Sequence, residues 1–172
     1  MSRSTVKKVL VHRFERETVS GFVDPLAYLK ENTLEILLTN GVLQTISFEE
    51  VKEVCFVKDF EAAKTRPDQR AFQSRPKFDG LWVELSFRDG DTLEGVLPNN
   101  LAASEPNGFT ITPPNSVGNT QRVFVPRQAL VALTVKAVIG LKATKKAKES
   151  SSAQPSLFTE LGSTPNSGLG LR

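Results

Sequence analysis

The chain has 172 residues, of which 39% are hydrophobic and 24% charged, a composition typical of globular rather than wholly disordered proteins. Its 22 Lys and Arg against 19 Asp and Glu give a net charge of +3, too small to indicate nucleic-acid binding without a local cluster. A single cysteine, Cys55, excludes an internal disulfide and multi-cysteine zinc modules, and a single histidine, His12, excludes a two-histidine metal site. No apolar run approaches the roughly 20 residues that span a bilayer, so we expect a soluble, cytoplasmic protein without membrane contact.

Ten short strands are predicted, five in each half of the chain. Residues 81–88 show the basis most clearly, because apolar residues recur at every second position, as in a half-buried antiparallel strand. In chain order the predicted strands cover 6–14, 18–24, 34–39, 42–48, 53–58, 81–88, 91–97, 108–112, 121–125 and 131–137.

The two halves are similar to each other. Residues 9–21 match 83–95 as a strand, a charged turn and a second strand that ends on glycine. In the second copy the turn contains Asp-Gly at Gly90, the strongest short hairpin signal. The similarity resumes between 46–54 and 125–133, after a loop that is longer in the second copy. The sequence therefore indicates an internal duplication.

Five short strands per copy favour a small, strongly bent barrel, because curling removes exposed sheet edges. We predict an all-β protein of two tandem SH3-like or Sm-like five-stranded barrels that close separately and pack side by side. The alternative is one ten-stranded sandwich with accidental similarity. The predicted parts are a first barrel, a basic linker, a second barrel and a disordered C-terminal tail, at 5–60, 61–78, 79–140 and 141–172.

The second copy resembles the Sm-like family. The resemblance lies in Arg88-Asp89-Gly90, in the segment 93–97 (LEGVL), and in the later strands around 123–125 and 133–135. The chain is also similar to an uncharacterised group of bacterial proteins with paired barrels. The resemblance implies a small barrel, RNA binding, and a duplication that supplies the strand pairing which Sm-like proteins obtain from neighbouring subunits. The family's Asp after that Leu is absent, since the sequence continues with 98–101 (PNNL).

Enzyme chemistry is not predicted, and neither a cofactor nor a metal is expected. His12 falls on a predicted strand and Cys55 lies in an apolar segment, which favours an inert buried thiol. No phosphate-binding loop or metal-ligand spacing occurs in the sequence.

Basic residues cluster in the linker and at the start of the tail, with Phe72 and Phe78 among the first group. Flexible cations can neutralise phosphates and aromatic rings can stack on bases, so the leading hypothesis is weak binding of RNA or DNA. The alternative is that these charges only keep exposed segments soluble. The predicted nucleic-acid-binding residues are Lys64, Arg66, Arg70, Arg75, Lys77, Lys142, Lys145 and Lys146. Trp82, the single tryptophan, is expected to pack against the linker or the first barrel.

Two short motifs suggest other partners. Arg66 and Arg70 form R-x-x-x-R, which looks like half of the PilZ motif and would make the protein a cyclic-dinucleotide sensor. In the tail, Gln154, Leu157 and Phe158 are similar to the peptide with which bacterial proteins dock on the DNA sliding clamp. The tail peptide supports a rival hypothesis, a protein-interaction adaptor that binds a protein partner through the tail.

Overall fold

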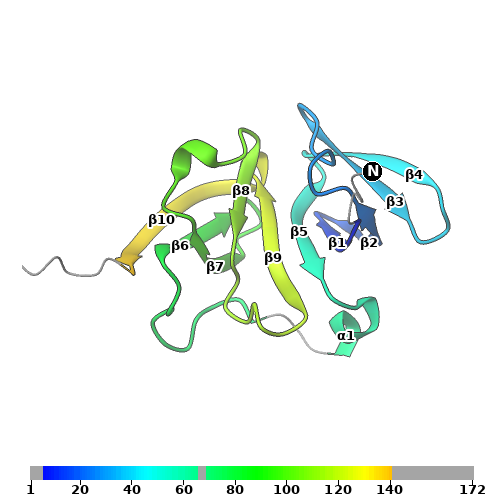
Figure 1. Cartoon of the computed structure of the whole chain (residues 1–172). Helices are drawn as coiled ribbons and strands as arrows, with labels where there is room; N and C mark the ends of the chain where they lie inside the picture. The colour runs from blue at the N-terminus through cyan, green and yellow to red at the C-terminus, as the bar shows by residue number, and fades with distance from the viewer. Residues whose placement is uncertain (1–5, 66–68, 141–172) are drawn as a thin grey trace, which may run out of the picture. The chain divides into compact units, whose positions relative to one another are not determined.

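The computed structural model describes residues 6–65 and 69–140, and this part of the chain is all-β (Figure 1). It contains ten strands, one short helix α1 (Phe60–Thr65) and two single 3₁₀ turns. The strands are β1 (Lys7–Arg13), β2 (Arg16–Val23), β3 (Thr33–Leu38), β4 (Leu43–Ser47), β5 (Val51–Val57), β6 (Gly80–Phe87), β7 (Thr92–Leu97), β8 (Gly108–Ile111), β9 (Thr120–Pro126) and β10 (Leu130–Ile139). Over these described residues, no helix has the length and apolar character of a membrane span.

All ten predicted strands are present, because the two-residue alternation matches the faces that the strands bury. In β6, Val83, Leu85 and Phe87 are buried, whereas the residues between them are half-buried. The helix α1 lies at the start of the segment predicted as a linker.

The strands form two sheets. The larger has the order β4-β3-β2-β1-β5-β9-β8 and the smaller the order β10-β6-β7. Strands β5 and β9, from different halves, lie side by side and pair antiparallel, with Cys55 opposite Val123 (Figure 1). The all-β class is thus confirmed, but no closed barrel occurs among the described residues and the separately closed barrels are not confirmed. The physical reason is that β5 and β9 satisfy each other's edge hydrogen bonds across the two halves.

The duplication is visible in the strand register. Val9 pairs with Gly21 in the first half, and the matching residues Val83 and Gly95 pair in the second. The fifth strand of each half returns to the first strand in equivalent register. The matching pairs are Val11–Val54 with Leu85–Leu133, and Val9–Phe56 with Val83–Val135.

The second half also repeats the link between its second and third strands, in reduced form. Phe22 pairs with Leu37 where β2 meets β3, and a single bridge joins Val96 to Thr112 at the equivalent place. Both halves therefore follow the order fifth, first, second, third and fourth strand. In the second half a single bridge is all that joins β7 to β8. Strands β6, β7 and β10 therefore form the smaller sheet, and β8 and β9 belong to the larger one.

Two hydrophobic cores lie on opposite faces of β1 and β5, and each core contains residues of both halves. Phe124 of β9 is fully buried in the core formed mainly by the first half. Leu10 and Cys55 belong to the core formed mainly by the second half. The halves within 6–140 consequently share their packing as well as a sheet.

Candidate functional site

Arg70, one of the cations predicted in the linker, makes hydrogen bonds and ion pairs with β5, β7 and the turn before β7. Its Nη1 donates to Oε1 and Oε2 of Glu53 at 2.8 and 3.1 Å, and its Nε donates to the Thr92 carbonyl oxygen at 3.0 Å. Its Nη2 lies 2.9 Å from Oδ2 of Asp91, and the guanidinium stands over the Phe87 ring. Two carboxylates therefore already neutralise Arg70, whose side chain fastens the linker to β5 and β7.

Lys52 completes this charge cluster. Its Nζ donates to Asp89 at 2.6 Å and to Asp91 at 3.0 Å. Partial burial alone would raise the pKa of Asp91, but the Lys52 hydrogen bond and the nearby Arg70 charge hold it below its usual value. The hydrogen bond from Lys52 likewise outweighs desolvation and lowers the pKa of Asp89.

The other predicted binding residues are not brought together. Arg75 and Lys77 are exposed, and Nη2 of Arg75 donates to the Val138 carbonyl oxygen at 3.4 Å. The side chain of Lys64 lies outside the described part of the structure. So do Arg66, Lys142, Lys145, Lys146 and the tail residues Gln154, Leu157 and Phe158.

Trp82 packs against the linker, one of the two positions that the sequence favoured. Its ring meets Phe72 edge-on, with centroids 6.1 Å apart, and Lys136 stands over it. Trp82 Nε1 and the Phe72 backbone N–H both donate to Oε2 of Glu94, at 3.2 and 2.9 Å, and Lys136 donates to Oε1. Burial raises the pKa of Glu94, but these donors outweigh it and leave the pKa lowered. Trp82 thus belongs to a polar network with Glu94 and Lys136.

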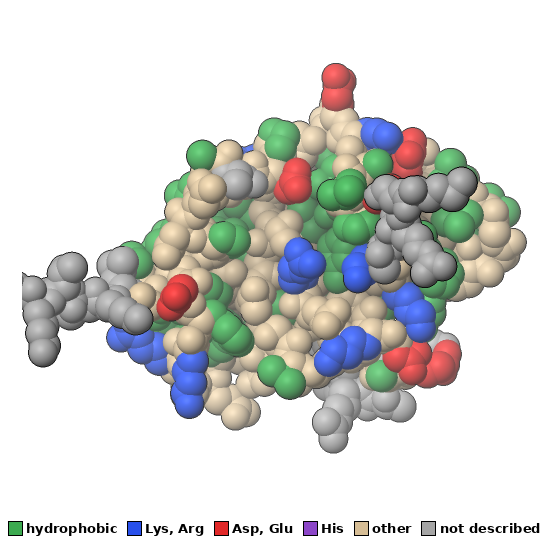
Figure 2. Space-filling model, viewed as in Figure 1, with side chains coloured by type: hydrophobic (Ala, Val, Ile, Leu, Met, Phe, Trp, Pro, Cys, Tyr) green, Lys and Arg blue, Asp and Glu red, His purple; other side chains and the backbone are tan. Residues whose placement is uncertain are grey.

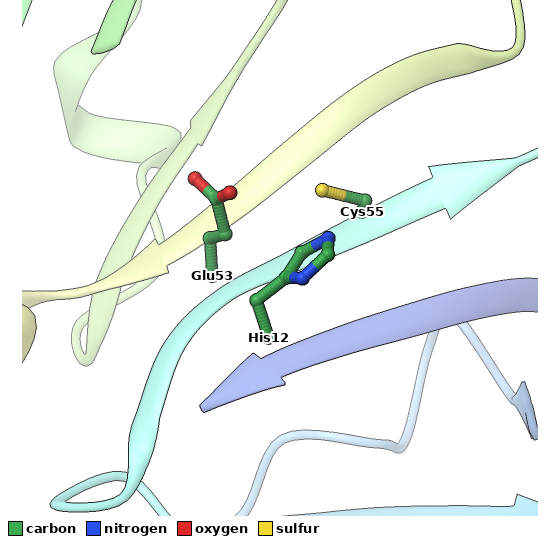
Figure 3. Close-up of side chains that lie close together, drawn as sticks. All are labelled: His12, Glu53 and Cys55. Atoms are coloured by element: carbon green, nitrogen blue, oxygen red, sulfur yellow. The ribbon is translucent and has the colours of Figure 1, made fainter. Parts of the chain in front are cut away.

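His12, Glu53 and Cys55 converge on one face of β1 and β5, and Figure 3 shows the three side chains directed toward one another. Their ligand atoms lie within 4.8 Å of each other, and these residue types bind zinc. However, both oxygens of Glu53 accept hydrogen bonds from Arg70, so its guanidinium would lie beside any metal ion. Cys55 is only 1% exposed, so its thiol is out of reach of a substrate. The arrangement fits a polar cluster in which Glu53 and Cys55 are buried and His12 is half-buried.

A recess of about 150 Å³ lies where the two halves join. Phe56 of β5 is half-buried and pairs directly with Arg122 of β9, and Lys7 of β1 lines the same recess. Below them, Tyr28 meets the Phe56 ring edge-on at 5.7 Å between centroids. The rest of the lining is Pro25, Glu105, Thr110 and Gln121. Figure 2 shows Lys and Arg side chains beside apolar atoms over the region of β1, β5 and β9.

This recess combines positive charge with an aromatic floor. Burial, followed by the charge of Glu105, raises the pKa of Tyr28 against the smaller opposing effect of Arg122, so the phenol stays neutral. A neutral hydroxyl can donate to or accept from a polar ligand, while Lys7 and Arg122 attract an anion. Sequence reasoning missed this site because Lys7, Phe56 and Arg122 lie on three different strands. They are brought together only when β5 pairs with β1 on one side and with β9 on the other.

A larger recess of about 610 Å³ lies among the hairpin ends around Phe14, and it has mixed charge. Arg16 lies 3.2 Å from Glu50, and Arg88 stands over the Phe14 ring with its guanidinium also bonded to the Glu49 carbonyl oxygen. Its cations are therefore engaged by neighbouring groups, which leaves the recess at the β5–β9 junction as the better candidate for an anionic ligand.

The described residues thus define an all-β protein with duplicated strand pairing and an aromatic recess flanked by two cations. Residues 5–137 match a family of unknown function (DUF6982), and the chain belongs to that family. No curated protein matches the chain, and no solved structure does.

Proposed function

We propose that this protein is a non-enzymatic binding module for single-stranded nucleic acid, RNA or DNA. The observation that carries the proposal is the recess at the β5–β9 junction, in which Lys7 and Arg122 flank Phe56 above Tyr28. Phosphates bind to paired cations with release of counterions, and a base stacks on an exposed aromatic face.

The position of Glu105 at this recess makes the proposal more specific. Its carboxylate repels a phosphate but accepts a hydrogen bond from the amino group of a base. We therefore place the backbone of the ligand along Lys7 and Arg122 and a base toward Glu105. The proposal keeps the basic residues predicted in the linker and the tail as further phosphate contacts. Arg70 is excepted, because its guanidinium is paired with Glu53 and Asp91.

The proposal includes the origin of the fold. Two copies of one SH3-like or Sm-like five-stranded unit account for the matching registers of β1, β2 and β5 with β6, β7 and β10. Small barrels of this kind are frequent in binding modules, but fold alone does not assign a ligand. The assignment to nucleic acid therefore depends on the recess.

Fluorescence anisotropy of labelled 15-mers of dT and U tests the proposal. We expect the dissociation constant to rise steeply between 50 and 200 mM salt, by roughly tenfold or more if three to four phosphates are contacted. Lys7→Gln and Arg122→Gln should each weaken binding several-fold and reduce the salt slope by about one. Phe56→Leu should weaken binding with the salt slope unchanged, because it removes stacking and no charge.

Arg16→Gln provides the matched control. It removes the same charge from an exposed side chain in the other recess, and it should leave affinity within twofold of the unmodified protein. Equal losses from Arg16→Gln and Arg122→Gln would show that only net charge matters. Binding that is absent, or that does not depend on Lys7 and Arg122, would refute the proposal.

A further inference from the structure

Two strands of the described structure have an unpaired edge that is rich in exposed apolar residues. In the larger sheet β4 is an outer strand, and in the smaller sheet β10 is an outer strand. Leu43 of β4 is 65% exposed and Val135 of β10 is 51% exposed. Val131 and Val138 are further exposed apolar residues of β10. Exposed Val42 directly precedes β4, and exposed Leu37 of the neighbouring β3 lies opposite Leu43.

Neither edge carries the charges that usually protect a sheet from further pairing. Leu43–Ser47 contains no charged residue and no proline. The same is true of β10 from Leu130 to Val135, and Lys136 beyond it is engaged by Glu94 and Glu84. Unprotected apolar edges favour the addition of another strand.

The pairing inside the chain provides the template for that addition. β5 borders β1 as β10 borders β6, and β4 borders β3 as β9 borders β8. β10 is thus the second-half counterpart of β5, and β4 is the first-half counterpart of β9. The chain pairs β5 with β9 internally and leaves the equivalent edges, β10 and β4, without a partner strand among the described residues.

We propose that β10 of one copy of this protein pairs antiparallel with β4 of a second copy, in the register that β5 and β9 use. The internal pairs are Val54–Phe124, Cys55–Val123 and Phe56–Arg122. The strand correspondence converts them into the intermolecular pairs Leu133–Thr45, Thr134–Gln44 and Val135–Leu43. The register thus brings the exposed Val135 and Leu43 against each other and removes both from water.

The contact is heterologous, because each copy offers a different edge at each end. Such a contact repeats from copy to copy, as a closed ring if the rotation closes and as a filament if it does not. The recess at the β5–β9 junction would then recur in each copy along the assembly. The assembly is inferred independently of any ligand.

Disulfide trapping with the full chain tests the proposed register. Leu43→Cys and Val135→Cys are purified separately, mixed and oxidised mildly. Opposite residues of antiparallel strands have Cα atoms about 4.5–5.5 Å apart, within disulfide range. We expect a heterologous cross-link in at least tenfold higher yield than from Leu43→Cys mixed with Val131→Cys, which lies about 13 Å out of register. The native Cys55 is 1% exposed and should not react.

Sedimentation velocity of the unmodified protein supplies the second measurement. The mean mass should rise with concentration from 1 to 100 µM, and Leu43→Lys or Val135→Lys should return it to that of a single chain. Equal cross-linking of Val131→Cys and Val135→Cys would refute the register. A single-chain mass at every concentration would refute the assembly.

Discussion

Replacing Arg70 with Met tests whether this arginine is a structural ion-pair partner. Methionine keeps an unbranched apolar stem against Phe87 but removes every hydrogen bond from the guanidinium. The loss leaves the carboxylate of Glu53, only 7% exposed, without its cation. The variant should therefore fold with a markedly lower free energy of unfolding.

The magnitude follows from the burial of the two partners. Removing one partner of a buried ion pair costs about 3–5 kcal/mol. Arg70 is 30% exposed and Asp91 42% exposed, so water screens part of the loss. We expect a decrease of about 3 kcal/mol, or a melting temperature lower by roughly 10 °C. Adding Glu53→Gln should recover about 1 kcal/mol, because the buried charge is then removed as well.

Urea unfolding followed by the fluorescence of Trp82, the single tryptophan, measures these differences. Arg75→Met is the matched control, because Arg75 is exposed and, among the described residues, makes only a long bond of 3.4 Å to a carbonyl oxygen. Its effect should stay within about 0.5 kcal/mol. If Arg70→Met changed stability as little as Arg75→Met, the structural role assigned to Arg70 would be wrong.

Two further predictions concern acid and glycine. The pKa values of Asp89, Asp91 and Glu94 are lowered on folding, so their stabilisation is present above their unfolded pKa values and is lost as pH falls through the folded ones. Urea midpoints should therefore hold steady from about pH 5 to 7 and decline below about pH 4, and a midpoint unchanged at pH 3 would contradict this linkage. Gly21→Ala and Gly95→Ala should each cost about 1–3 kcal/mol in the same assay, because the new methyl would lie 2.7 Å from Ile36 Cγ1 or 2.5 Å from Ile111 Cδ1. Unchanged stability of both variants would show that β3 and β8 can shift to accommodate the added methyl group.

The strands were predictable because local pattern determines them. The alternation in 81–88 reports which side of β6 is buried, and the Asp-Gly turn at Gly90 marks the hairpin that follows. The matching glycines at 21 and 95 have a shared reason, since each lies where a third-strand isoleucine packs against the backbone. Sequence similarity between the halves thus reflects equivalent packing.

The partition of the strands between sheets was not predictable in this way. Strand β9 pairs with β8 of its own half along one edge and with β5 of the first half along the other. The local alternation does not determine which strand takes that second edge. The prediction of separately closed barrels assumed that each of the two similar segments also folds as a separate unit. The pairing of Cys55 with Val123 shows that the boundary runs through a sheet.

The candidate residues were only partly predictable for the same reason, because local sequence does not show which strands pair. Charge clusters along the sequence indicated the linker, but Arg70 lies beside Glu53 and Asp91, which are distant in sequence and invisible to a count of local charges. Lys7 and Arg122 were not among the predicted binding residues, because they lie far apart in the sequence, in β1 and β9. Only strand pairing puts them on either side of Phe56.

The proposed recess therefore requires both halves of the duplication. Phe56 and Lys7 come from the first half and Arg122 from the second, so neither half supplies the aromatic ring together with both cations. A single five-stranded unit would have to form the β5–β9 contact with another molecule, at the entropic cost of association. Joining two units in one chain makes that contact intramolecular, and it leaves β4 and β10 as the edges at which the same pairing can continue between copies.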